Sequence, residues 1–271
     1  MFIKKGERRW VLIYGGFANS NVWFDSENGV FGWVLSEATA TVESFGNDWY
    51  RLKILWTQNS TQVRVYNTDS GTSTQSTGNG TDGLYIWGAQ LEVGSYATSY
   101  IPTSGSTVTR NQDIFTRDGI GSLINSTEGV LFVEMAALSD DGTTRALSLS
   151  DGTSSNRILI YYSPTSNQIV GLYTYGGSTQ VSITHTLSDS TEFIKFAFKF
   201  KENDCAFWIN GIEVGIDTSS TAFSANTLNA LGFDSGAGGS NFYGKVKQLQ
   251  VYKTALTDEQ LLQLTGESGT D

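Results

Sequence analysis

The chain has 271 residues, enough for one large domain or two ordinary ones, each with its own core. Aromatic residues make up 13% and charged residues 16%, and there are 30 glycines, a composition typical of all-β proteins because stiff side chains suit pleated sheets and glycine suits turns. The formal charge of −10 argues against a cation-rich groove for nucleic acid, and no apolar run approaches the length of a membrane span.

The charge is unevenly distributed along the chain. Residues 1–110 contain 8 Lys and Arg against 9 Asp and Glu, a net of −1, whereas residues 111–271 contain 9 against 18, a net of −9. An acidic surface mainly promotes solubility. The single cysteine, Cys205, excludes an internal disulfide framework, and no apolar segment of a secretory signal follows Met1.

The first part of the chain consists of short apolar segments between turn residues. Such spacing predicts strands at residues 2–5, 9–14, 21–24, 30–35, 39–45, 49–56, 62–67 and 84–91. Residues 68–83 are rich in Thr, Ser, Gly and Asn without periodicity, and we expect an exposed, mobile loop there. The strand at 84–91 is expected to be buried, and residues 94–110 form a polar connector.

The second part repeats the pattern. Strands are predicted at residues 129–138, 145–149, 156–162, 168–175, 180–186, 193–201, 228–233 and 243–252. Residues 205–215 predict a hairpin that turns at Asn210 and Gly211. Alternation of Phe and Lys in 193–201 predicts a sheet with one solvated face. A short helix is expected over 256–264 with Thr257 as its N-cap.

These elements predict an all-β fold. Short strands separated by turn signals indicate β-sandwiches, and a single helical segment argues against an α/β protein. We predict two β-sandwich (jelly-roll) domains in tandem with one short C-terminal helix. The first domain spans residues 1–110, a connector spans 111–127, and the second domain spans 128–271.

Three segments of the first domain carry a family resemblance. FIKKGER (residues 2–8), FGNDWYRL (45–52) and LYIWGAQLEVGSYATSYIPTSGSTVTR (84–110) resemble a carbohydrate-binding-module-like jelly roll that recurs in bacteriophage tail and head fibres. In those proteins further strands precede the one matching residues 2–6, so the resemblance implies a domain lacking its first strands. We therefore expect the edge from Phe2 to Tyr14 to be covered by a neighbouring virion chain. Phage fibres of this type also imply a homo-oligomer, with a trimer favoured.

The second domain resembles another family. FWINGIEVG (residues 207–215) and GKVKQLQVYKTALTDEQLLQLT (244–265) resemble the laminin-G-like, concanavalin A-like lectin/glucanase sandwich. The resemblance covers about residues 127–265. Sugar-binding proteins, enzymes and structural proteins all use this fold, so it does not decide the activity.

Catalytic residues are not indicated. The glucanases of this fold carry an E-x-D-x-x-E strand, because retaining hydrolysis needs two carboxyls on one face. Glu134 is the only carboxylate in residues 129–138, His185 is the only histidine, and Cys205 begins an apolar strand. We interpret the chain as non-enzymatic.

Two kinds of binding residue are candidates. Aromatic side chains that could stack on sugar rings are Trp10, Tyr14, Trp23, Trp49, Tyr161, Tyr173 and Tyr175, with core packing as the alternative role for each. Loop carboxylates that could hold calcium are Asp140, Asp141, Asp151 and Asp234. Ordinary turn formation is the better explanation of these four, so no cofactor is expected, with structural Ca²⁺ as the alternative.

These observations lead to one functional hypothesis. The sequence predicts a phage virion structural protein, a fibre, spike or decoration subunit, that serves assembly and adhesion to host-surface glycans. Its partners would be other virion proteins and glycans, with no nucleic acid and no membrane, and it would be made in the host cytoplasm. The alternatives are a glycan-degrading accessory enzyme or depolymerase, and a purely architectural virion protein without sugar binding.

Overall fold

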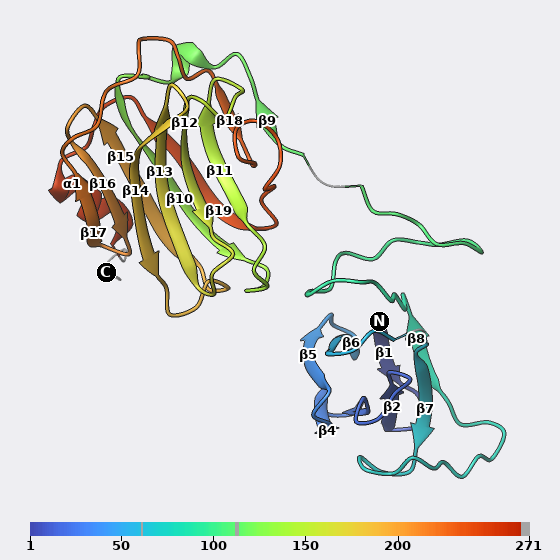
Figure 1. Ribbon diagram of the computed structural model, residues 1–271. Helices are drawn as coiled ribbons and strands as arrows, with labels where there is room; N and C mark the ends of the chain where they lie inside the picture. Colours follow the sequence, from blue (N-terminus) through green and yellow to red (C-terminus); the bar gives the residue numbers. More distant parts are fainter. Residues whose placement is uncertain (61, 112–113, 267–271) are drawn as a thin grey trace. The chain divides into compact units, whose positions relative to one another are not determined.

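The computed structural model describes residues 1–60, 62–111 and 114–266, so parts of the predicted connector and the last five residues lie outside the described residues. The chain divides into two compact units, Met1–Asn111 and Gln112–Asp271. The predicted all-β fold is confirmed, because the described part contains four sheets and one α-helix (Figure 1). No helix in the described ranges is long and apolar enough to cross a membrane.

The first unit is a sandwich of two four-stranded sheets. Their strand orders are β5-β6-β1-β8 and β4-β3-β2-β7. The strands are β1 (Phe2–Lys5), β2 (Trp10–Tyr14), β3 (Val22–Asp25), β4 (Val30–Val34), β5 (Ala38–Ser44), β6 (Trp49–Trp56), β7 (Arg64–Thr68) and β8 (Leu84–Trp87). Alternate positions of the strands send Ile3, Val11, Ile13, Phe24 and Leu52 into one core between the sheets.

The strands between Phe2 and Tyr14 lie in the middle of this sandwich. β1 pairs with β6 and β8, and β2 pairs with β3 and β7. Both strands have occupied neighbours on each side, and Ile3 and Ile13 are fully buried. The expectation that this segment is an edge covered by another chain is therefore wrong. Residues 6–9 carry the chain from one sheet to the facing sheet, and the later strands β6, β7 and β8 complete the pairing.

The strand predicted at 84–91 differs from expectation. β8 ends at Trp87, because Gly88 adopts a φ of +59° that takes the chain out of the strand. β8 is an edge strand, and Tyr85, Ile86 and Trp87 are 59%, 46% and 54% exposed. The prediction of a buried strand is wrong, because β8 has a strand partner on one side only within the described residues.

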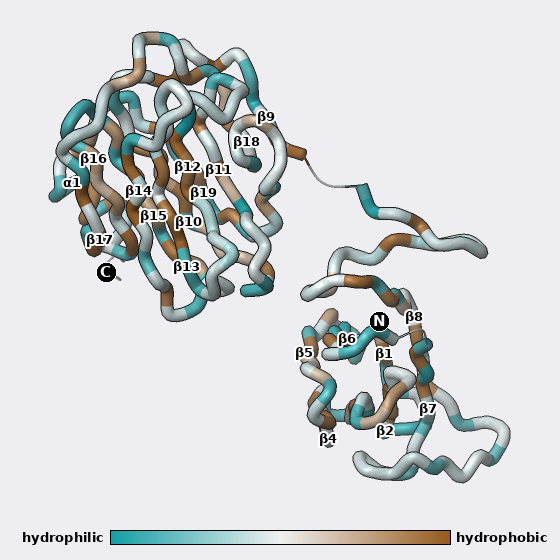
Figure 2. Tube along the Cα trace, in the orientation of Figure 1, coloured by the Kyte–Doolittle hydropathy of each residue, from teal (hydrophilic) through white to brown (hydrophobic). Residues whose placement is uncertain are grey.

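The second unit is a larger sandwich of a five-stranded and a six-stranded sheet. Their strand orders are β17-β16-β15-β10-β19 and β14-β13-β12-β11-β18-β9. The strands are β9 (Thr116–Arg117), β10 (Glu128–Ala137), β11 (Arg145–Ser150), β12 (Arg157–Tyr162), β13 (Gln168–Tyr175), β14 (Ser178–Thr186), β15 (Ile194–Lys201), β16 (Cys205–Ile209), β17 (Ile212–Asp217), β18 (Ala230–Gly232) and β19 (Gly244–Tyr252). The hydrophobic colours of Figure 2 concentrate on strands such as β10 and β12, while the loops that join the strands are mostly pale or teal.

Local sequence signals explain several of these elements. The hairpin of β16 and β17 is confirmed, and Asn210 and Gly211 both have positive φ, 45° and 80°, as a two-residue hairpin turn requires. Residues 121–123 form a 3-10 turn that the sequence did not indicate. The core between the sheets contains a row of phenylalanines, Phe196, Phe198 and Phe207.

The C-terminal helix covers one face of the five-stranded sheet. Helix α1 (Asp258–Thr265) begins after the predicted N-cap Thr257, which forms a capping box with Gln260, an arrangement worth about 1 kcal/mol. Leu261 is fully buried and packs in a cluster with Phe132 and Trp208. The predicted solvated face of β15 is therefore covered in part, at Ala197 and Lys199, while Lys201 on the same face stays exposed.

Lys199 is a buried cation at the contact between helix α1 and the five-stranded sheet. The side chain of Lys199 is only 8% exposed, and its Nζ lies 2.6 Å from Asp204 and 3.7 Å from Asp258. The two carboxylates compensate the charge that the helix buries.

Candidate binding surfaces

The outer face of the six-stranded sheet is the first candidate surface. On β11, β12 and β13 the core residues alternate with residues that face outward, and strand register places the outward residues in rows. The rows are Ala146–Tyr161–Val170, Ser148–Leu159–Leu172 and Ser150–Arg157–Thr174. This face thus combines the apolar pair Leu159 and Leu172 in the middle row with an aromatic ring in one neighbouring row and a cation in the other.

Tyr161 and Arg157 are the accessible groups of this outer face. Both are partly exposed, whereas Leu159 between them and Val170 beside Tyr161 are 4% and 3% exposed and form an apolar floor. Burial raises the pKa of the Tyr161 hydroxyl, and the positive charge of Arg157 partly opposes this rise. The side chain therefore presents a neutral phenol, which both donates and accepts hydrogen bonds.

Arg157 is held by the loop of residues 233–242. Its Nη1 donates to the carbonyl oxygen of Ser235 at 2.7 Å, while its Nε is buried without a hydrogen-bond partner in the described part of the chain. The loop is fixed to the sheet, because Ser150 Oγ donates to the carbonyl oxygen of Gly236 at 3.1 Å. Gly236 has a φ of +85°, and a Cβ there would come within 2.8 Å of Ser150. Only glycine therefore lets the loop backbone lie this close to β11.

The other tyrosines predicted in this unit lie on the opposite side of the sheet. Tyr173 is 1% exposed, donates its hydroxyl to the carbonyl oxygen of Thr221 at 2.5 Å and packs its ring 4.5 Å from that of Phe223. Burial raises its pKa. Tyr175 also packs against Phe223, at 5.5 Å. Tyr173 has no free ring face for a sugar, and neither tyrosine shares a face with Tyr161.

Three of the four aromatic candidates in the first unit gather on one surface. Trp10, Tyr14 and Trp23 lie on the outer face of the β4-β3-β2-β7 sheet, and Trp49 lies on the outer face of the other sheet. Trp23 is 3% exposed, and its Nε1 donates to the carbonyl oxygen of Ser73 at 2.7 Å. Its ring is therefore also removed from the set that could stack on a sugar.

The loop that follows β7 covers Trp10 and Trp23. A Cβ at Gly71 would come within 2.7 Å of the Trp10 ring, which shows how closely the loop backbone lies on this face. The loop is the segment predicted as exposed and mobile. Its side chains are mostly exposed as expected, but its backbone is anchored to the sheet.

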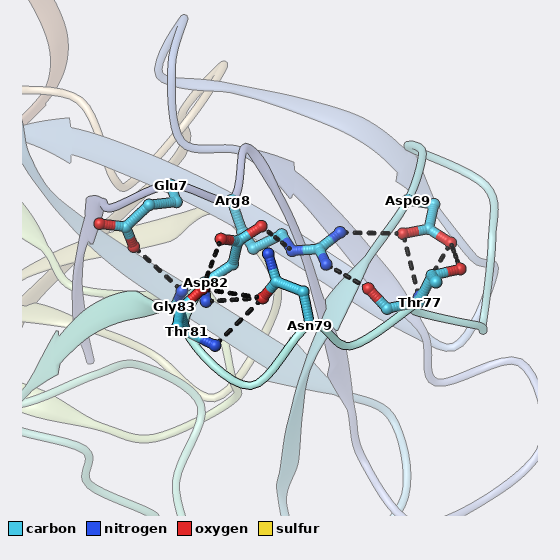
Figure 3. Close-up of polar contacts among 8 residues, drawn as sticks. All are labelled: Glu7, Arg8, Asp69, Thr77, Asn79, Thr81, Asp82 and Gly83. Carbon is cyan, nitrogen blue, oxygen red and sulfur yellow. Dashed lines mark hydrogen bonds and ion pairs between the residues drawn. The ribbon is translucent and has the colours of Figure 1, made fainter.

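Arg8 provides that anchor (Figure 3). Its Nη1 lies 3.1 Å from Asp69 and its Nε lies 3.4 Å from Asp82, and the guanidinium also donates to the carbonyl oxygen of Thr77. The backbone N–H of Arg8 donates to the carbonyl oxygen of Gly83 at 3.2 Å. One cation thus joins the first and last parts of the loop, which no local sequence pattern could indicate.

The exposed part of this face carries residues that the sequence analysis did not select. Trp33 stacks on Trp23 at 5.8 Å and is 51% exposed. The Arg64 guanidinium carbon lies 5.9 Å from the centre of the Tyr14 ring, and its Nη1 donates to the Tyr66 hydroxyl at 3.4 Å. Alternation along β7 could have identified Tyr66, which shares the face of Trp23. It could not have identified Trp33, which has the parity of the core residue Phe31 and reaches the outer face beside a register shift between β3 and β4.

The four loop aspartates all bond to nearby groups of the chain, three within their own turn and Asp140 with the turn at Ser166 and Asn167. Asp140 accepts from Asn167 N, Asp141 pairs with Arg145, Asp151 accepts from Thr153 N, and Asp234 accepts from Gly236 N. Among the described residues no group of three or more His, Cys, Asp or Glu side chains could hold a metal ion. This arrangement favours turn formation as their role.

Comparison with known proteins bears on the second unit. Residues 131–262 match the concanavalin A-like lectin/glucanases superfamily (Laminin_G_3). The match covers a little under half of the chain, and it supports a lectin-like β-sandwich for this unit. A comparison with curated proteins finds no match.

Solved structures similar to the chain include sialidase domains and a pentraxin. The leech intramolecular trans-sialidase is 19% identical with a TM-score of 0.44, over 54% of this chain and 24% of that enzyme. The Ruminococcus gnavus IT-sialidase CBM40 bound to alpha2,3 sialyllactose is 16% identical with a TM-score of 0.45, over 54% of this chain and 86% of that one. A heptameric SAP-like pentraxin from Limulus polyphemus is 14% identical with a TM-score of 0.42, over 53% and 71%. These values are too low to transfer a ligand or an activity.

Proposed function

We propose that the chain is a non-catalytic glycan-binding protein whose binding surface is the outer face of the six-stranded sheet. The observation that carries the proposal is the placement of Tyr161 and Arg157 beside the apolar floor of Leu159 and Val170 on a lectin-like sandwich. A pyranose ring has an apolar face that packs on an aromatic ring and hydroxyls that accept hydrogen bonds from a guanidinium. Both requirements are met on one surface.

Binding without turnover is the favoured activity because of where the carboxylates lie. Glu134 is on β10 in the five-stranded sheet, and its carboxylate lies 2.9 Å from Lys247 Nζ. It is therefore not on the proposed face, and hydrolysis would need a pair of carboxyls around one sugar linkage. The alternative, a depolymerase, would release reducing ends from a polysaccharide that the chain binds.

Removal of the Tyr161 ring tests the binding surface. On a glycan array, the Tyr161→Ala variant should bind the wild-type glycans about tenfold more weakly, since loss of ring contact costs about 1.4 kcal/mol. Tyr161→Phe should retain most binding, because it keeps the ring. Tyr66→Ala is the matched control, an exposed tyrosine of the first unit. A loss with Tyr66→Ala but not with Tyr161→Ala would place the site elsewhere and contradict the proposal.

We further propose that the protein is a structural subunit of a phage virion, a homo-oligomer, with a trimer favoured, that serves adhesion to host glycans. The support is the resemblance of residues 84–110 to segments of phage fibre proteins. Peptides of the chain should then appear by mass spectrometry in purified particles at a constant ratio to the major capsid protein. Their absence from washed particles would contradict the virion role, while incorporation without any glycan binding would favour the architectural alternative.

A further inference from the structure

An exposed apolar ridge runs along the end of the first unit. We define the ridge as residues 85–93, of which Tyr85, Ile86, Trp87, Leu91 and Val93 are 59%, 46%, 54%, 52% and 98% exposed. Isolated apolar side chains on a surface need no explanation, but five large ones within nine consecutive residues concentrate apolar surface at this edge, with Ile86 on the core face of the sheet and Tyr85 and Trp87 on its outer face. Such concentrations mark surfaces that bind another molecule.

Contacts within the chain hold the ridge in place, and the half-exposed Trp87 packs its ring 4.8 Å from that of Phe2 and 4.9 Å from that of Tyr100. Gln90 accepts from the backbone N–H of Ile101 at 2.9 Å, and Glu92 accepts from the backbone N–H and the hydroxyl of Thr98, both at 2.7 Å. The polar residues of the alternating segment are therefore directed toward the chain's own residues 98–101. Leu91 and Val93 are left on the exposed side, although β8 has already ended.

The edge of the sandwich is incomplete at the ridge. Ile86 lies opposite Ile3 in the β1–β8 pairing, which places it on the core face of the sheet, and yet it is nearly half exposed while Ile3 is fully buried. β8 also has one side without a strand partner among the described residues. An open core edge beside an unpaired strand favours a partner that supplies both backbone pairing and apolar side chains.

Charge favours a second copy of this chain as that partner. The only ionisable groups in the ridge are Tyr85 and Glu92, and Glu92 is already hydrogen-bonded to Thr98. Residues 1–110 carry a net −1, from 8 cations and 9 anions, whereas the rest of the chain carries −9. Two copies therefore repel each other least through their first units. An edge strand is also self-complementary, because the same row of N–H and C=O groups is present on both copies.

We propose that the ridge is the surface through which copies of this chain associate. It would bury the open core edge at Ile86 and the exposed side chains of Trp87, Leu91 and Val93. The proposal rests on the homo-oligomer proposed above and names its surface, and pairing of two identical edge strands gives a two-fold dimer, whereas the phage-fibre resemblance favours a trimer. It is independent of glycan binding by the second unit, so assembly and glycan binding can fail separately. The self-association it predicts is reversible and localised to residues 85–93.

Introduction of charge on the ridge tests this surface. In sedimentation velocity experiments with the full chain, wild type should form an oligomer, and the double variant Leu91→Glu/Val93→Glu should be monomeric, with a dissociation constant raised about a hundredfold or more. Both side chains are largely in solvent, so the substitutions leave the fold intact, which circular dichroism checks. Ile212→Glu/Ile216→Glu is the matched control, with two equally added charges at exposed positions of β17.

Each outcome decides the proposal. An oligomer of wild type and control together with a monomeric ridge variant would support it. A wild type that remains monomeric at its highest soluble concentration would overturn it, since the ridge would then be covered by another molecule or by another part of the same chain. A ridge variant that still associates, or a control that dissociates equally, would also overturn it, because association would then not depend on residues 85–93.

Discussion

Phe207→Ala should lower the free energy of unfolding of the second unit by about 3–5 kcal/mol, the largest effect that we expect from a single substitution. Phe207 is fully buried, with its ring 6.2 Å from that of Phe196 and 5.8 Å from that of Phe198. Across the core, Gly171 has no side chain, and a Cβ there would lie only 3.1 Å from the Phe207 ring. The facing residue therefore cannot extend into the space that truncation leaves, and the cavity persists.

The tryptophans offer a way to measure each unit separately. Six of the seven, Trp10, Trp23, Trp33, Trp49, Trp56 and Trp87, lie in the first unit, and Trp208 lies in the second. In protein labelled with 5-fluorotryptophan, the fluorine signal of Trp208 should disappear at lower urea concentration in Phe207→Ala. Ile212→Ala, at a position 65% exposed, should change the midpoint little. An unchanged Trp208 midpoint in Phe207→Ala would contradict the expected cavity.

Acid should weaken the first unit through Asp25. Its side chain is 2% exposed and accepts hydrogen bonds from Arg9 Nη2 at 2.6 Å, from Arg9 Nε at 2.9 Å and from Asn28 Nδ2 at 2.8 Å. Burial disfavours the ionised carboxylate, but the hydrogen bonds from Arg9, Asn28 and two backbone amides outweigh it and lower the pKa of Asp25 from 3.8 to about 2. A carboxylate that is more acidic in the folded protein than in the unfolded chain stabilises the fold above its unfolded pKa.

The pH window follows from that direction. The contribution of Asp25, about 2 kcal/mol, is complete above about pH 4 and is lost as the pH falls toward 2. We expect Asp25→Asn to reduce the stability of the first unit by about this amount at pH 7 and to differ little from wild type at pH 2. Urea titrations at several pH values, followed by the first-unit tryptophan signals, measure the difference. A difference that is constant from pH 7 to pH 2 would contradict the role of the charge, and Asp48→Asn, in an exposed turn, is the control.

Local sequence patterns predicted which segments form strands, turns and the helix better than they predicted which of these elements lie side by side. The hairpin at Asn210 and Gly211 and the helix after Thr257 depend on residues a few positions apart, and both are confirmed. Alternation of apolar and polar residues shows which side chains of a strand share a face, but it does not show which strand lies beside it. For this reason the sequence did not indicate that β1 and β2 belong to different sheets, that β8 is an exposed edge, or that α1 covers part of the lysine face of β15.

The same limit applies to the candidate site. Tyr161 and Tyr173 are both in alternating strands, and only the register, in which Tyr161 lies opposite Val170 and Tyr173 opposite Ile158, separates them onto different faces. Arg157 could have been found from sequence, because it shares the parity of Tyr161 within β12. The covering of Trp23 could not, because it depends on a loop held by a cation that lies 61 residues from its partner Asp69.

The Arg8 contacts determine in which solution conditions the loop over the tryptophans of the first unit stays in place. By joining Asp69 and Thr77 to Asp82, one guanidinium closes the loop into a ring, the task that a disulfide performs in many secreted β domains. This chain has one cysteine and closes the ring without oxidation, so the loop over the tryptophans is indifferent to reducing agents. Its sensitivity is to ionic strength instead, because Asp69 is 44% exposed and salt screens a pair that water can reach.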